Sequence, residues 1–189
     1  PIGYWDIVIG GTPCQPFSKA NLTRKGSSHP LFPVTPRFFE LVNELEPLAF
    51  LWENVKGLLD VSQKHYFLEF LDKVRGKYCL AYRVLNTADY GVPQKRERLL
   101  VLGVRRDLQT KPSFPPPTHS KIPNMTLNGY LKPWTSVGEA IGDLLDSEDK
   151  EVVWIKIDTV PETWWKKHPP LCLEEPSRAI PSWMGKNLR

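Results

Sequence analysis

The chain has 189 residues, of which 41% are hydrophobic, and it carries a net charge of +4. This length suits one domain or one and a half, and the mild basic excess fits a nucleic-acid or other anionic partner without requiring one. No apolar run approaches the ~18 residues of a membrane-spanning helix, and we find no signal peptide. Cys14, Cys79 and Cys172 are far apart, which argues against a disulfide framework or a zinc site and favours a reducing cytosolic compartment.

Short apolar runs alternate with amphipathic segments in the first half of the chain. Residues 4–9 predict a buried strand, and residues 21–36 predict a loop. Helical spacing of apolar residues predicts helices over 37–46 and 66–77. The apolar positions are Phe38, Leu41, Val42 and Leu45 in the first helix and Phe67, Phe70, Leu71 and Val74 in the second. The other predicted strands are residues 48–52, 79–85 and 98–104.

This order predicts an α/β fold with a parallel sheet and a hairpin at one edge. The character changes near residues 107–112, so we divide the chain at 110/111. Residues 111–133 are rich in proline and polar residues, and helical spacing returns at 137–144. Trp154, Trp164, Trp165 and Trp183 follow. These tryptophans and Trp134 could stack on nucleic acid, although core packing is the commoner role of such residues.

A lone thiol follows the first predicted strand. Residues 10–18 read Gly-Gly-Thr-Pro-Cys-Gln-Pro-Phe-Ser. Loops at the carboxyl ends of strands in open α/β sheets are where ligands bind. Cys14 is therefore a candidate nucleophile, and a buried small hydrophobe is the alternative. Its position alone leaves both open.

Two further groups of polar residues lie at strand ends. Glu53 and Asn54 close the second strand, where Glu53 could donate a proton or could simply be a solvated acid. Gln94, Arg96 and Arg98 alternate along one predicted strand, so they would share a face. Forked guanidinium groups suit phosphate or carbonyl recognition, although charged sheet edges are also common.

Together, the Pro-Cys-Gln, Glu-Asn-Val and Gln-x-Arg-x-Arg motifs, in this order and spacing, resemble the DNA cytosine-5 methyltransferase family. The resemblance covers residues 4–107, with fainter similarity at 114–119 and 175–178. It implies a partial Rossmann-like sheet of the kind that binds S-adenosylmethionine (SAM), followed by an irregular region that leads into target recognition. Residues 1–110 would be the catalytic half of the methyltransferase domain. Residues 111–189 would begin the target-recognition region.

The resemblance also assigns roles in catalysis. Cys14 would be the thiolate that adds to carbon 6 of cytosine, and Glu53 would be the acid that protonates N3. Arg98 would lie near the cytosine O2, and Arg96 and Gln94 would support the catalytic loop or the backbone. The target base would have to leave the stack to reach the thiol.

The remaining implied roles concern DNA and the cofactor. Asn54 would orient neighbouring loop groups, and both it and Gln94 are candidate nucleic-acid contacts. Gln15 and Ser18 would lie on the loop that closes over DNA, and Pro13 is a candidate SAM contact. The basic residues that could meet phosphates are Lys19, Arg24 and Lys25.

The family binds SAM through a Phe-x-Gly-x-Gly loop that this sequence does not contain, and Gly138-x-x-x-Gly142 suits helix packing better. Because the chain also begins directly with a strand, we expect an internal segment that is inactive by itself and that needs residues outside it to bind SAM. A tRNA cytosine-5 methyltransferase, an inactive fragment and half of a split enzyme remain alternatives. The expected partners are double-stranded DNA and a cognate restriction endonuclease, in a prokaryotic cytoplasm near the nucleoid and not at a membrane.

Overall fold

The structure, a computed structural model, describes residues 5–18, 26–127 and 129–141 and the backbone of Ser177–Arg178. The chain divides into two compact units. The first unit holds Pro1–Leu85 and Glu97–Pro115, and the second holds Asn86–Arg96 and Pro116–Arg189.

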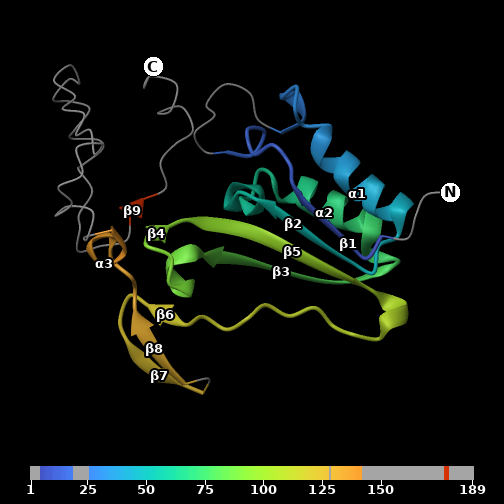
Figure 1. The fold of residues 1–189 in the computed structure, drawn as a ribbon. Helices are drawn as coiled ribbons and strands as arrows, with labels where there is room; N and C mark the ends of the chain where they lie inside the picture. Colours follow the sequence, from blue (N-terminus) through green and yellow to red (C-terminus); the bar gives the residue numbers. More distant parts are fainter. Residues whose placement is uncertain (1–4, 19–25, 128, 142–176, 179–189) are drawn as a thin grey trace, which may run out of the picture. The chain divides into compact units, whose positions relative to one another are not determined.

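A four-stranded sheet forms the centre of the first unit (Figure 1). In order across the sheet, the strands are β1 (Ile7–Gly11), β2 (Ala49–Asn54), β5 (Glu97–Arg105) and β3 (Tyr78–Asn86). Strands β1 and β2 are parallel, whereas β5 runs antiparallel to β2 and, in Figure 1, to β3. The hairpin prediction is confirmed, but the sheet is mixed where we predicted a parallel one. The difference arises because β5 inserts between β2 and β3.

Helices α1 (Val34–Leu45) and α2 (Lys64–Arg75) cover one face of this sheet (Figure 1). Helix α1 begins earlier than predicted, since Pro36 lies in its first turn, where a missing N–H costs nothing. The apolar positions predicted for α2 are all buried. In α1 the buried positions are Thr35, Phe39 and Val42, so the predicted stripe is displaced and Leu41 is exposed.

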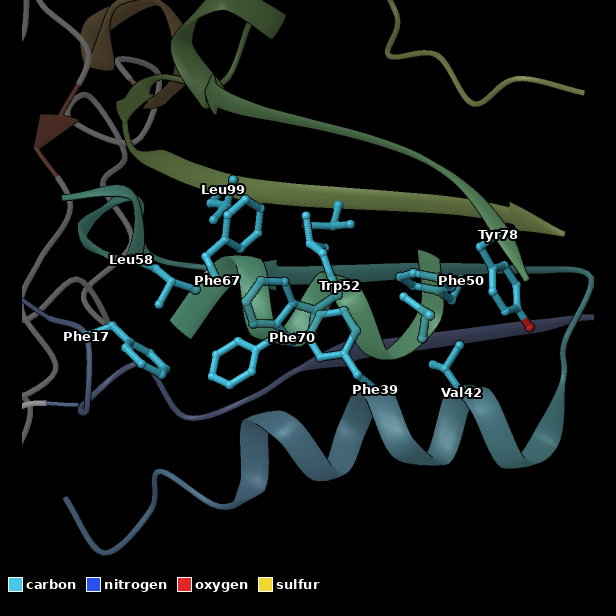
Figure 2. Packing of buried hydrophobic residues seen from close by; sticks show 13 residues of the cluster. Phe17, Phe39, Val42, Phe50, Trp52, Leu58, Phe67, Phe70, Tyr78 and Leu99 are labelled. Atoms are coloured by element: carbon cyan, nitrogen blue, oxygen red, sulfur yellow. The ribbon is translucent and has the colours of Figure 1, made fainter. Parts of the chain in front are cut away.

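Aromatic rings fill the space between the helices and the sheet (Figure 2). Phe39 of α1 stacks on Phe70 of α2 with a centroid distance of 6.0 Å, and it meets Trp52 of β2 edge-on at 5.1 Å. Phe39 and Trp52 are fully buried. At the far end of this core, the Tyr78 hydroxyl donates to the Pro47 carbonyl at 2.8 Å, and burial raises the pKa of Tyr78 to about 12.

The opposite face of the sheet is apolar and is covered by neither α1 nor α2. On this face, apolar side chains of neighbouring strands lie side by side in register, for example Ile9, Leu51 and Leu102. Ile7 and Ile9 of β1 are 61% and 71% exposed. The prediction of a fully buried first strand is therefore wrong. Among the described strands β1 lies at the edge of the sheet, where only one of its faces meets a helix layer.

Gly103 of β5 leaves room for the ring of Phe50 on β2. It is the register partner of Phe50, and an added Cβ would lie 2.6 Å from Phe50 Cδ1. Because Phe50 is itself packed on all sides, we expect Gly103→Ala to lower the free energy of unfolding by about 1–3 kcal/mol through overpacking. Urea denaturation measures this change.

Gly76 supplies the matched control for this prediction. It ends α2 with a helical φ of −62°, and an added Cβ would meet nothing within 4 Å. Gly76→Ala should be neutral or stabilise the fold by up to about 1 kcal/mol, because alanine restricts the unfolded chain. Equal destabilisation by both variants would contradict the overpacking argument.

The second unit holds a small sheet in the order β6–β8–β7, formed by His119–Ser120, Gly129–Pro133 and Asn124–Thr126. The half-buried Trp134 donates its indole N–H to Asp89 at 2.8 Å, and the Lys95 ammonium lies 5.5 Å from its ring centroid. The short helix α3 (Val137–Ile141) follows, and the rest of the predicted helix lies outside the described residues. The four later tryptophans also lie outside them. No helix in the described part of the chain is long and apolar enough to cross a membrane.

Candidate active site

Three predicted catalytic residues belong to one end of the first sheet. Because β1 and β2 are parallel, their carboxyl ends share an edge, and the antiparallel β5 begins at that edge. Cys14 follows β1, Glu53 lies near the end of β2, and Arg98 is the second residue of β5. Glu53 faces Gly11 in the register, and its Oε2 would lie 3.5 Å from a Cβ added there.

Glu53 and Arg98 form an ion pair. The Arg98 Nε lies 2.7 Å from the Glu53 Oε1, with the side chains 23% and 37% exposed. The Arg98 Nη1 also donates to the Glu97 carbonyl at 2.8 Å, and Glu97 pairs in turn with Lys56. The guanidinium is thus held from two sides. A charge-assisted contact of this length fixes the orientation of the Glu53 carboxylate.

The loop that carries Cys14 is exposed at the thiol and anchored just beyond it. Cys14 and Gln15 are exposed, whereas Pro16 and Phe17 are buried. The Phe17 N–H donates to the Cys14 carbonyl at 2.9 Å and closes a tight turn. The Phe17 ring lies 6.1 Å, centroid to centroid, from Phe70 in the core. This geometry excludes the alternative of a buried, inert cysteine and leaves the thiol accessible on a fixed loop.

On the other side of the thiol, Thr12 bonds to three buried side chains. Its hydroxyl lies 3.1 Å from the Trp52 Nε1, 3.1 Å from the Asn54 Nδ2 and 3.0 Å from the Thr35 Oγ1. The Asn54 Oδ1 accepts from the Val55 N–H at 2.8 Å, and Asn54 has no exposed surface. Asn54 therefore points into the protein interior and contacts the loop through Thr12.

Sequence reasoning did not single out Thr12, Trp52 or Thr35 as site residues. Thr12 lies 40 residues before Trp52 and 23 residues before Thr35 in the chain, so no local sequence pattern could indicate these contacts. One signal was available: Thr35 is a polar residue four positions before Phe39, and therefore on the buried face of α1.

The structure assigns Gln94, Arg96 and Arg98 to different segments of the chain. Gln94 belongs to β4 (Gln94–Lys95), which pairs with β9 (Ser177–Arg178), whereas Arg98 belongs to β5. Arg96 lies between the two strands, so the single strand face predicted for these three residues is wrong. The backbone of Arg96 explains the break, because its N–H donates to Asn86 Oδ1 at 3.2 Å and its carbonyl accepts from Thr87 at 3.0 Å.

The structure describes some of the remaining predicted site residues and not others. Pro13 and Ser18 are half-buried on the Cys14 loop, together with the exposed Gln15. Lys19, Arg24 and Lys25 lie outside the described residues.

Comparisons with known proteins identify the family of the chain. A sequence model of the C-5 cytosine-specific DNA methylase family matches residues 2–171. Type II methyltransferase M.XorII of Xanthomonas oryzae pv. oryzae is 38% identical, over 79% of this chain and 32% of its own length. Type II methyltransferase M.AquIA of Picosynechococcus sp. is 35% identical, over 86% of this chain and 70% of its own length.

A solved structure of a methyltransferase is also similar to this chain. The crystal structure of a candidate DNA modification methyltransferase encoded within an E. coli prophage matches with a TM-score of 0.52 and 28% identity, covering 72% of this chain and 34% of that one. The chain therefore spans about a third of M.XorII and of this neighbour, and 70% of M.AquIA. The fold is part of the Rossmann-like sheet of SAM-dependent methyltransferases. The resemblance inferred from the motifs is confirmed: the chain belongs to the C-5 cytosine-specific DNA methylase family.

Proposed function

We propose that the protein carrying this chain transfers a methyl group from SAM to carbon 5 of a flipped cytosine in DNA, through a covalent Cys14 adduct. One observation carries the proposal. An exposed cysteine on an anchored loop and a fixed Glu53–Arg98 ion pair belong to the same edge of one sheet. A nucleophile and an acid at one strand edge, in a family that methylates cytosine, fit this reaction best.

Cys14 supplies the nucleophile. Its thiolate forms a bond to carbon 6, and the electrons of the C5–C6 double bond make carbon 5 nucleophilic. When carbon 5 has gained the methyl group, the bond from that methyl to its donor has broken and the demethylated donor leaves. A water-derived base then takes the proton from carbon 5, the C5–C6 double bond re-forms as the bond from carbon 6 to sulfur breaks and releases the thiolate, and N3 returns its proton to Glu53. Cytosine in a duplex is stacked between its neighbours, so the base must be extruded before this loop can reach it.

Glu53 supplies the proton. Attack at carbon 6 places negative charge on the ring. The Glu53 carboxyl, once it has taken up a proton from solvent, donates that proton to N3 and returns to the carboxylate that pairs with Arg98. Arg98 contacts the Glu53 Oε1, while Oε2 lies on the side of Gly11, which precedes the Cys14 loop. Arg98 thereby orients the Glu53 carboxyl group. We place the Arg98 guanidinium near the cytosine O2.

Several finer assignments complete the proposal. Asn54 orients the Cys14 loop; because it is fully buried, we do not give it a direct contact with nucleic acid. Gln15 and Ser18 contact DNA, and Gln94 and Arg96 support the backbone of the segment that carries them. Residues 1–110 act as the catalytic half, and 111–189 begin the target-recognition region. Double-stranded DNA, a cognate endonuclease and a cytoplasmic, nucleoid-associated location remain predictions.

The residues present do not fit a SAM site. The sequence has no Phe-x-Gly-x-Gly loop, and Gly138 lies within the short helix α3. In the part of the chain that the structure describes, Pro13 is the one residue we would assign to the cofactor. We therefore propose that residues outside this sequence hold SAM, and that the chain alone is inactive.

A methyl-transfer assay tests the proposed activity. Tritium from methyl-labelled SAM is followed into duplex DNA and into tRNA in parallel, with the complete protein that carries this chain. We expect label on carbon 5 of cytosine in DNA and none in tRNA. Label in tRNA alone would replace the substrate and keep the chemistry, and label in neither would contradict the proposed activity.

A further inference from the structure

The Thr12 hydroxyl is the meeting point of the loop, the sheet and the first helix. Thr12 follows directly after β1, Trp52 and Asn54 belong to the buried face of β2, and Thr35 lies in the first turn of α1. Trp52, Asn54 and Thr35 have no exposed surface. The Asn54 amide also reaches the Thr12 carbonyl at 3.3 Å, so both the backbone and the side chain of Thr12 are held.

Donor and acceptor capacity fixes the direction of every bond at this hydroxyl. The indole of Trp52 and the amide nitrogen of Asn54 can only donate, and they occupy the two lone pairs of the Thr12 oxygen. The hydroxyl proton of Thr12 must then go to Thr35 Oγ1. Loss of the hydroxyl at position 12 would remove the acceptor of the Trp52 indole N–H and the donor to Thr35, whereas the Asn54 amide would keep the Thr12 carbonyl.

The position of Thr12 in the chain links this network to the thiol. Pro13 separates Thr12 from Cys14, and a proline restricts both its own φ and the backbone of the residue before it. Few torsions therefore remain between the fixed threonine and the cysteine. Phe17, buried in the core, holds the loop from the other side.

We propose that Thr12 is a positioning residue for Cys14, and that Trp52 and Thr35 act through its hydroxyl. The inference rests on the proposed nucleophilic role of Cys14. Thr12 contacts no reacting atom in this mechanism. It fixes the position of the Cys14 thiol through the backbone of the loop. A displacement of about 1 Å at a reacting group can lower a rate about 100-fold, so the loss of this hydroxyl should be visible in catalysis.

Thr12→Val tests the proposal, because valine keeps the shape of threonine and removes only the hydroxyl. We expect kcat to fall about 10–100-fold while KM for DNA changes by less than about 3-fold. Hydrogen exchange should accelerate in a peptide covering residues 12–18, where the Phe17 amide is bonded to Cys14, and stay unchanged in α2. Thr12→Ser keeps the hydroxyl and should restore both properties.

Two further variants keep the test decisive. Thr110→Val removes an exposed threonine hydroxyl that bonds only the Leu108 carbonyl, and it should change neither readout. If Thr12→Val does not fold, Thr35→Val removes just the acceptor of the Thr12 proton and should give a smaller change in the same direction.

The outcomes separate this inference from the proposed function. Unchanged kcat and unchanged loop exchange in a folded Thr12→Val or Thr35→Val protein would overturn the positioning role. Hydrogen exchange that rises equally in residues 12–18 and in α2 would also overturn it, because it would show that the Thr12 hydroxyl stabilises the whole fold and does not specifically hold the loop. If Cys14→Ala retains activity, the nucleophile is wrong, whereas the exchange data still report whether Thr12 fixes the loop.

Discussion

Replacing Cys14 by alanine is expected to lower the rate of methyl transfer at least about 10⁴-fold, because no other group on the loop can form the bond to carbon 6. The loop itself should survive the change. Its anchors, Thr12 on one side and Phe17 on the other, do not involve the sulfur. The rate of tritium transfer to duplex DNA measures the loss, and the unfolding curve should stay close to that of the parent.

Cys79 provides the control for this substitution. It lies half-buried on β3, and the contact recorded for its sulfur is one with the Arg106 guanidinium at 3.9 Å. Cys79→Ala should keep the rate within about 2-fold of the parent. If Cys14→Ala lowers the rate by clearly less than about 10⁴-fold, the covalent route is ruled out for this chain.

The second large effect concerns Glu53. Glu53→Gln keeps the shape of the side chain but cannot deliver a proton, and it removes the charge that Arg98 binds at 2.7 Å. We expect methyl transfer to fall about 10²–10⁴-fold, the usual contribution of a positioned acid. Single-turnover kinetics on a cytosine-containing duplex measures this rate separately from product release.

Glu97→Gln is the matched control for Glu53→Gln. Glu97 is a neighbouring carboxylate at the same sheet edge, exposed and paired with Lys56. Exposed ion pairs contribute about 0–1 kcal/mol, so both stability and rate should change little. If the two variants lose activity equally, the effect belongs to the charge of the edge and Glu53 has no special role.

Much of the first unit could be predicted from periodicity. The buried stripe of α2 was predicted residue by residue, because its apolar positions are separated by charged ones. In α1, Phe38 and Phe39 are adjacent, so two stripes fit the pattern equally well and packing selects Phe39. The motif residues Cys14 and Glu53 could be brought to one edge from strand order alone, whereas Arg98 reaches that edge because β5 runs antiparallel to β2.

Pairing between distant segments could not be predicted. Whether β5 lies beside β2 or outside β3 depends on which arrangement buries Leu99 and Val101, and both arrangements have the same local pattern. The break at Arg96 depends on hydrogen bonds to Asn86 and Thr87, ten and nine residues earlier. The Thr12 network likewise exists only once β1, β2 and α1 have met.

The exposed side chains of β1 have a consequence for handling this polypeptide. Among the described strands β1 lies at the sheet edge, where a strand offers unpaired N–H and C=O groups, and within Ile7–Gly11 it presents the apolar Ile7 and Ile9 with no charged residue or proline. Such an edge is a template for another strand of the same kind, so the 189-residue chain on its own is a candidate for concentration-dependent association through β1. A polar substitution at Ile9, on the face away from α1, would remove this template and leave the Cys14 loop untouched.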